Sequence, residues 1–175
     1  MPRTKGIFNA SLFAAVLAIA TAAASLTVIT TPASAEIAAR PGWVITPTTH
    51  KYLDLTQLVA NAAKRHKISV VAVASATVGV ELALQEKIPG NMVIGLYHPR
   101  FAKRTLAASI PAGIEAPIRI YITENADGTA TISYKKPSFV FAPYMEEGGA
   151  ALKELATELD ALFDSLVKDA ATPLG

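Results

Sequence analysis

The chain has 175 residues and no cysteine, which excludes disulfides, thiol nucleophiles and cysteine-ligated metal centres. Its formal net charge of +2 comes from Arg3 and Lys5, the only charged residues before Glu36. Residues 36–175 therefore carry no net charge, which argues against nucleic acid as a partner, because nucleic-acid binding depends on a basic excess.

The first 35 residues have the organisation of a secretory signal peptide. The two basic residues precede a long uncharged, apolar stretch that ends in the small residues Ala33-Ser34-Ala35. We predict cleavage between Ala35 and Glu36 and a periplasmic or secreted location by general secretion, since no twin arginine precedes the apolar stretch. After cleavage we expect no membrane contact. The alternative is an uncleaved anchor, because residues 12–29 are just long enough to span a bilayer.

The next segment predicts a strand followed by a helix. Residues 36–42 form a flexible lead-in, a strand starts at Trp43-Val44-Ile45, and Pro47 marks an edge or break in it. The helix begins at Asp54, where Gln57 completes a capping-box-like pair. Its buried stripe repeats at helical spacing and comprises Leu55, Leu58, Val59, Ala62 and Ala63.

The middle of the chain predicts two more strands. The compact, β-branched segment Ile68–Ala74 predicts a strand buried on both faces. Residues 77–87 are ambiguous and could form a short helix. A third strand covers Met92–Tyr97, and Phe101–Ser109 predicts a short helix with Leu106 facing inward.

The clearest local signal lies in residues 118–135. Isoleucine occupies every second position in residues 118–123, and apolar and polar residues alternate again in residues 130–135. With Asp127-Gly128 between them, these segments predict a β-hairpin. If the isoleucines fill the core, the polar residues face outward, namely Arg119, Tyr121, Thr123, Thr131, Ser133 and Lys135.

The last part of the chain predicts an extended segment and a long helix. Residues 137–143 are extended, and the aromatic patch there either pins this segment to the core or lines an apolar pocket. Residues 149–168 form a helix whose leucines pack over the sheet or, alternatively, meet a partner. Residues 170–175 form a disordered tail. The patch comprises Phe139, Phe141, Tyr144 and Met145, and the leucines are Leu152, Leu155, Leu159, Leu162 and Leu166.

These elements predict a single α/β domain of the α+β type over residues 43–169. The order is strand, helix, strand, a variable segment, three strands and a final helix. We expect a mainly antiparallel sheet packed against two main helices.

Four motifs in this order resemble the bacterial and archaeal family called domain of unknown function 302. The resemblance covers Trp43–Val167 and implies a β-α-β4-α fold, but no established activity. One departure is His98, because the family commonly has Asn before this proline. The motifs are Gly95-Leu-Tyr97-His98-Pro99, Pro111-Ala-Gly113-Ile-Glu115-Ala-Pro117, Tyr121-Ile-Thr-Glu124 with Asp127-Gly128, and Ser133-Tyr134-Lys-Lys-Pro137-Ser138.

His98 is the histidine best placed to carry chemistry. It ends the third predicted strand and precedes Arg100, Lys103 and Arg104. Such a cluster at a strand end can receive a carboxylate, phosphate or sulfate. The ordinary alternative is a strand-to-helix turn with solvated basic residues. No two histidines have metal-ligand spacing, so we predict neither a metal site nor a cofactor.

The hairpin supplies the remaining candidates. Arg119 and Tyr121 share one face of a predicted strand, and we add Tyr134 as a third contact residue. This face is a shallow ligand or dimer surface, or else plain solvated sheet. Glu115 and Glu124 are expected to be surface charges or partners of Arg119.

The sequence therefore predicts an exported binding or accessory domain for a small anionic or amphipathic ligand, or for a protein partner. One alternative is an enzyme that uses His98 as a general base or metal ligand. Another is a homodimer formed through the hairpin face or the leucine helix. Neither a P-loop nor a nucleophile-elbow motif is present, so we lean away from an enzyme. The predicted contact residues are His98, Arg100, Arg104, Arg119, Tyr121 and Tyr134.

Overall fold

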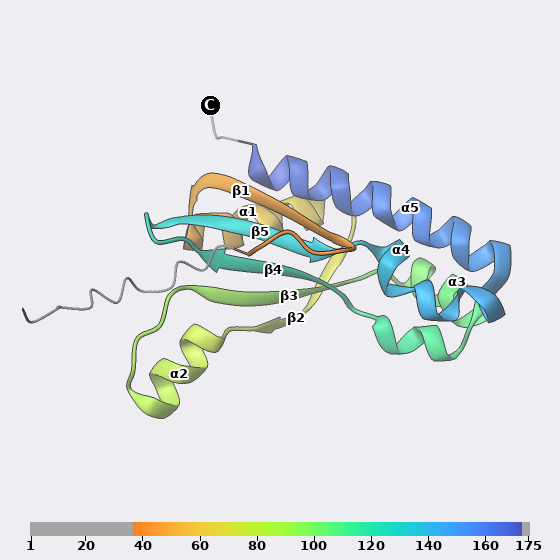
Figure 1. Ribbon diagram of the computed structural model, residues 1–175, viewed down its shortest axis with the longest axis horizontal. Helices are drawn as coiled ribbons and strands as arrows, with labels where there is room; N and C mark the ends of the chain where they lie inside the picture. Colours follow the sequence, from red (N-terminus) through yellow and green to blue (C-terminus); the bar gives the residue numbers. More distant parts are fainter. Residues whose placement is uncertain (1–36, 173–175) are drawn as a thin grey trace, which may run out of the picture. The chain divides into compact units, whose positions relative to one another are not determined.

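A computed structural model describes residues 37–172, which form five strands and five helices. The strands make one antiparallel sheet in the order β1-β5-β4-β3-β2 (Figure 1). This confirms the predicted α+β class and β-α-β4-α order, into which short helices are inserted. The strands are β1 (Trp43–Lys51), β2 (Ser69–Ala74), β3 (Asn91–Tyr97), β4 (Ile118–Glu124) and β5 (Thr129–Lys135). The helices are α1 (Tyr52–Arg65), α2 (Ala76–Leu84), α3 (Pro99–Ala108), α4 (Pro137–Val140) and α5 (Met145–Ala171), with 3-10 turns η1 (Pro111–Glu115) and η2 (Ala142–Tyr144).

The two ends of the chain limit what the structure says about the sequence predictions. The predicted signal peptide and the bond between Ala35 and Glu36 lie outside the described residues, as do residues 173–175 of the predicted tail. Helix α5 continues to Ala171 and buries Ala170, so the prediction of a disordered tail from residue 170 is wrong at its first residues. Within residues 37–172, no helix is long and apolar enough to cross a bilayer.

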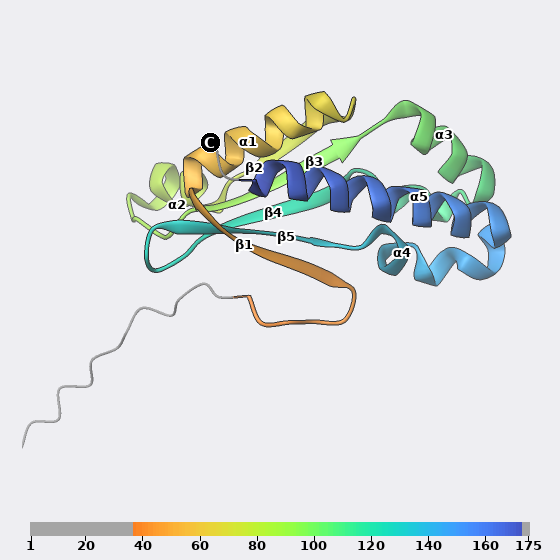
Figure 2. The same cartoon turned by 90° about the horizontal axis from the view of Figure 1, so that it is seen from above.

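Helices α1 and α5 cover one face of the sheet (Figure 2). Because side chains alternate along a strand, every second residue of β4 and β5 meets these helices. The buried residues on this side of the two strands are Ile118, Ile120, Ile122, Ala130, Ile132 and Tyr134. Facing them, α5 buries Leu152, Leu155, Leu159, Phe163 and Leu166, which confirms that its leucine stripe packs over the sheet. We call the opposite side of the sheet the outer face.

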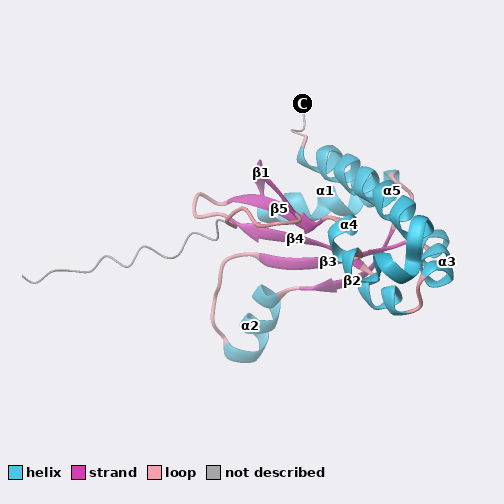
Figure 3. Ribbon diagram, turned by 45° about the vertical axis from the view of Figure 1, so that its right-hand side comes forward, coloured by secondary structure: helices cyan, strands magenta, loops and turns pink. Residues whose placement is uncertain are grey.

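Strand β2 differs most from its prediction. The pattern predicted a strand buried on both faces, but all six of its residues are exposed. Its apolar composition suits a central strand, yet β2 ends the sheet and pairs only with β3. The ambiguous segment after it forms α2, which has no buried residue and projects beyond the β2 edge of the sheet (Figure 3).

Three local predictions are also corrected. Helix α1 begins at Tyr52 without a side-chain cap, so Asp54 and Gln57 form no capping box. Leu106 is half exposed, because the inward side of α3 carries Phe101 and Thr105. The segment predicted to be extended forms α4 and η2 instead, since Pro137 suits the first turn of a helix.

We predict that Leu155→Ala lowers the free energy of unfolding by about 2–5 kcal/mol, because it leaves a cavity in the core beneath α5. Denaturant unfolding followed by circular dichroism measures this change. The matched control is Leu53→Ala, whose side chain is 71% exposed. We expect that variant to change stability by less than about 0.5 kcal/mol. Equal effects would contradict the packing described above.

The second prediction concerns alkaline pH. Burial, together with the charges of Asp164 and Asp160, raises the pKa of Tyr134 from 10.0 to about 12. The neutral phenol stabilises the fold fully at pH values below its pKa in the unfolded state. This stabilisation is lost as the pH rises through its pKa in the folded state. Between pH 9 and pH 11 we expect a loss of roughly 1 kcal/mol from this phenol. Tyr134→Phe should lack that part of the loss in denaturant unfolding, and equal losses in both proteins would refute the assignment.

Candidate functional site

The outer face carries the polar side chains of the β4–β5 hairpin. Because Ile118 and Ile120 face the helices, Arg119 and Tyr121 project from the opposite side of β4. Strand β5 places Ser133 beside Tyr121, and β1 places its first residue beside Lys135. The outward orientation predicted for the polar residues is confirmed, although the small side chains of Thr123, Thr131 and Ser133 are buried.

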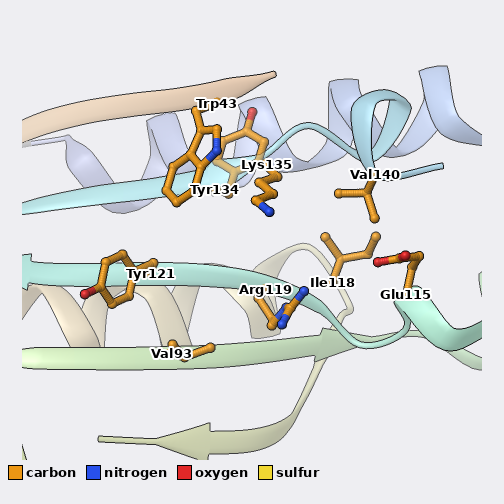
Figure 4. Close-up of a pocket in the computed structure, with 9 residues that line it drawn as sticks. All are labelled: Trp43, Val93, Glu115, Ile118, Arg119, Tyr121, Tyr134, Lys135 and Val140. Atoms are coloured by element: carbon orange, nitrogen blue, oxygen red, sulfur yellow. The ribbon is translucent and has the colours of Figure 1, made fainter. Parts of the chain in front are cut away.

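A cavity of about 240 Å³ opens on this face, and we call it the outer groove (Figure 4). Its walls come from β1, β3, β4, β5, η1 and α4. Apolar and aromatic side chains supply most of the lining, and three charged residues complete it. The lining residues are Trp43, Val93, Glu115, Ile118, Arg119, Tyr121, Tyr134, Lys135 and Val140.

Trp43 is held in the groove by its chain neighbours. Gly42 has a φ of 74° and lies so close to Phe139 that a Cβ atom there would overlap the ring. Its carbonyl oxygen accepts a hydrogen bond of 2.8 Å from the Lys136 N–H. The Arg40 guanidinium and the Lys135 ammonium lie 5.8 Å and 5.7 Å from the centroid of the Trp43 ring. These cation–π contacts orient the indole and keep positive charge beside it.

Arg119 and Lys135 lie opposite each other on neighbouring strands. Ile120 pairs with Tyr134 in the antiparallel register of β4 and β5. The next position in that register places Arg119 opposite Lys135. Both are exposed, and their side chains reach toward the same space (Figure 4). No ion pair joins either of them to an acidic residue within residues 37–172. Because directly opposed like charges are destabilising, this end of the groove favours an anion.

The two glutamates near the hairpin have other partners than Arg119. Glu115 accepts a hydrogen bond of 3.0 Å from the Tyr144 hydroxyl. That hydrogen bond is the main reason why the pKa of the Tyr144 phenol is raised, and burial of the phenol is the second. Glu124 accepts a hydrogen bond of 2.7 Å from the Gly90 N–H. Of the two expected alternatives, surface charges or partners of Arg119, the pairing with Arg119 is therefore wrong, and both glutamates are partly exposed.

Two buried hydroxyl groups on the outer face lack hydrogen-bond partners. They are the hydroxyls of Thr123 and Ser133, which are 3% and 0% exposed as residues. Ser133 pairs directly with Tyr121, whose own hydroxyl accepts a hydrogen bond from the Asn91 amide. A buried hydroxyl without a partner is costly, so the neighbourhood of Tyr121 has unused capacity to bond a polar group.

His98 caps helix α3. Its Nδ1 accepts a hydrogen bond of 3.1 Å from the Arg100 N–H, and its ring centroid lies 5.3 Å from that of Phe101. This geometry explains why a residue common at helix caps, such as Asn, suits the position before Pro99. His98 and Arg100 border a separate open cleft of about 440 Å³ between α3 and α5.

The remaining predicted contacts lie elsewhere. Arg104 forms an ion pair with Glu158 of α5. Tyr134 is 2% exposed and packs against Phe163, with ring centroids 5.6 Å apart. Its side chain therefore belongs to the core, and its prediction as a contact residue is not supported. The structure therefore places Arg119, Tyr121 and, as a buried wall residue, Tyr134 at the outer groove, and it places His98, Arg100 and Arg104 elsewhere.

Sequence reasoning missed Trp43 and Lys135 as site residues. Lys135 was readable as an outward residue of the hairpin, and Trp43 as the start of a strand. Their contact depends on the β1–β5 register, which joins distant parts of the chain. Within residues 37–172, no three acidic or histidine side chains gather to hold a metal ion.

We predict that His98→Ala lowers the free energy of unfolding by about 0.5–2 kcal/mol, because the Arg100 N–H loses its acceptor. His98→Asn keeps a side-chain acceptor and should stay within about 0.5 kcal/mol of the wild type. Denaturant unfolding of the three proteins tests the capping role. An Asn variant as unstable as the Ala variant would contradict it.

Comparisons with known proteins identify a family whose function is unknown. The model of the family described as "Domain of unknown function DUF302" matches residues 44–169. The crystal structure of an uncharacterized conserved DUF302 protein from Bacillus stearothermophilus is similar, with a TM-score of 0.66, 15% sequence identity, and coverage of 75% of this chain and 99% of that chain. At this identity the likeness shows the fold alone. No curated protein matches. Because the family model spans most of the sequence, the chain belongs to the DUF302 family.

Proposed function

We propose that the protein is an exported binding domain whose outer groove takes a small amphipathic anion. The anionic group would lie between Arg119 and Lys135, and the apolar part against Trp43 and Val93. The basic and apolar organisation of residues 1–35 supports export.

The opposed pair of Arg119 and Lys135 carries this proposal. Two cations on one face repel each other, and an anion between them turns that repulsion into two charge-assisted hydrogen bonds. Arg104 of α3 forms an ion pair with Glu158 of α5. Arg119 and Lys135 have no such match among the described residues.

The rest of the lining supports an apolar body attached to the anion. Trp43 and Tyr121 offer aromatic surface, and Val93 and Val140 offer aliphatic surface. The cavity of about 240 Å³ is below the roughly 300–1,000 Å³ of sites for drug-sized ligands. It therefore suits a small molecule or the end of a longer one.

Trp43 gives this proposal a direct probe, because it is the only tryptophan in the chain. We expect octanoate to change Trp43 fluorescence saturably, and octanol and octylamine to bind at least about ten-fold more weakly. The matched chain length separates the contribution of the charge from that of the apolar tail. Equal binding of the three compounds, or no change with octanoate, would contradict the proposal.

Charge-removing variants locate the binding site. Arg119→Gln and Lys135→Gln should each weaken octanoate binding by about ten-fold or more, because each removes a charge-assisted hydrogen bond. Without ligand, Arg119→Gln should be at least as stable as the wild type, because the repulsion is gone, whereas Lys135→Gln also loses its cation–π contact with Trp43. The control is Arg100→Gln, an exposed arginine in the cleft beside α3. If this control weakens binding equally, the ligand does not occupy the outer groove.

A further inference from the structure

The segment from Ser69 to Pro89 has no buried residue, and we call it the β2–α2 surface. Most of its large side chains are apolar and open to solvent, with Val73 59% exposed and Leu82 79% exposed. Its charged residues are Glu81, Glu86 and Lys87, of which only Glu81 lies in β2 or α2. Extended apolar patches of this kind mark interaction sites on soluble proteins.

The two edges of the sheet are built differently. Strand β1 contains Pro47, a register shift after it, and Lys51, which are devices that discourage pairing with another chain. Strand β2 has the sequence Ser-Val-Val-Ala-Val-Ala, without a charge or a proline. A register shift between Val70 and Ala72 leaves only Val71 outside the ladder with β3. The β2 edge is therefore open where the β1 edge is protected.

The apolar layer beneath the helices also continues onto β2. Val70 pairs with Leu96, and Val73 pairs with Ile94. Both partners on β3 are 3% exposed, whereas Val70 and Val73 are 38% and 59% exposed. Directly paired residues share one face of a sheet. The hydrophobic layer thus extends beyond the area that α1 and α5 cover, and it continues beside the projecting helix α2 (Figure 3).

We propose that the β2–α2 surface is the interface with a second copy of this chain, related by a two-fold axis beside β2. A two-fold axis brings β2 next to its own copy in the antiparallel direction, which continues the pattern of the sheet. A self-complementary interface places like charges near each other, and β2 and α2 themselves carry only Glu81, which limits that repulsion. The segment also supplies about 20 residues, which is what an interface of standard size takes from each partner.

A membrane is the other occupant that exposed apolar residues suggest. Helices that lie on a membrane surface carry Lys and Arg on their polar side. Helix α2 has no basic residue, and its charge is the acidic Glu81. The chemistry of α2 therefore fits a protein surface like itself.

The test is the oligomeric state of the purified exported protein. Multi-angle light scattering at about 100 µM should give twice the monomer mass, because an interface of standard size keeps a dimer associated at that concentration. Leu82→Glu should weaken association by at least about 100-fold, because it buries an unpaired charge at the interface. The control Leu53→Glu changes a side chain that is 71% exposed on α1 and should leave the dimer intact. A monomeric wild type, or dissociation by both variants, would overturn the proposal.

A cross-linking experiment covers the case in which Leu82→Glu fails to fold. The chain has no cysteine, so a single introduced thiol reports one position. Val71→Cys, near the middle of β2 and 53% exposed, should form an intermolecular disulfide under mild oxidation, whereas Leu53→Cys should not. Equal cross-linking of both, or a monomer that binds phosphatidylglycerol vesicles through Leu82, would assign the surface otherwise. Because the outer groove contains no residue of this surface, Trp43 fluorescence tests the proposed function independently.

Discussion

The packing of α5 against one face of the sheet is the constraint on which the rest of the structure depends. Ile120, Ile132 and Leu155 are fully buried in the core that the sheet shares with the helices, and burial of apolar surface is the dominant favourable contribution to folding. Once β4 and β5 turn their isoleucines toward α5, strand geometry turns every alternate residue to the outer face. Arg119 and Lys135 are therefore brought together by packing in which neither takes part.

The relative sizes of these effects explain how a destabilising arrangement persists. Opposed like charges on a sheet cost roughly 0.2–1 kcal/mol, whereas one buried leucine contributes about 2–5 kcal/mol when judged by truncation to alanine. A single core position thus offsets the repulsion between Arg119 and Lys135. The fold has no cysteine with which to form a disulfide, so the core must supply this margin. The repulsion at the proposed binding feature is thus small beside the packing on the opposite face of the sheet.

Local sequence signals were sufficient for the hairpin and for α5, because both depend on periodicity within one segment. The position of β2 was not predictable in this way. Its valines indicate a strand that contacts apolar surface, but periodicity does not say whether that strand lies at the centre or the edge of a sheet. Pairing of β1 with β5 decides the question, since it leaves β2 at the opposite edge. The same long-range pairing brings Trp43 to Lys135. His98 is different, because a residue directly before Pro99 at the start of a helix is a readable cap position.

Gly95 connects the two surfaces proposed above. A Cβ atom at this position would lie 3.1 Å from the Cβ of Ala72 and 2.9 Å from Pro117, so the absence of a side chain allows β2 to approach closely. Gly95 also pairs with Arg119 on β4. On that side Arg119 has no side chain to contact, and its opposite neighbour is the like-charged Lys135. One glycine therefore admits β2 at the open edge of the sheet and presents no side chain to Arg119 in the proposed site.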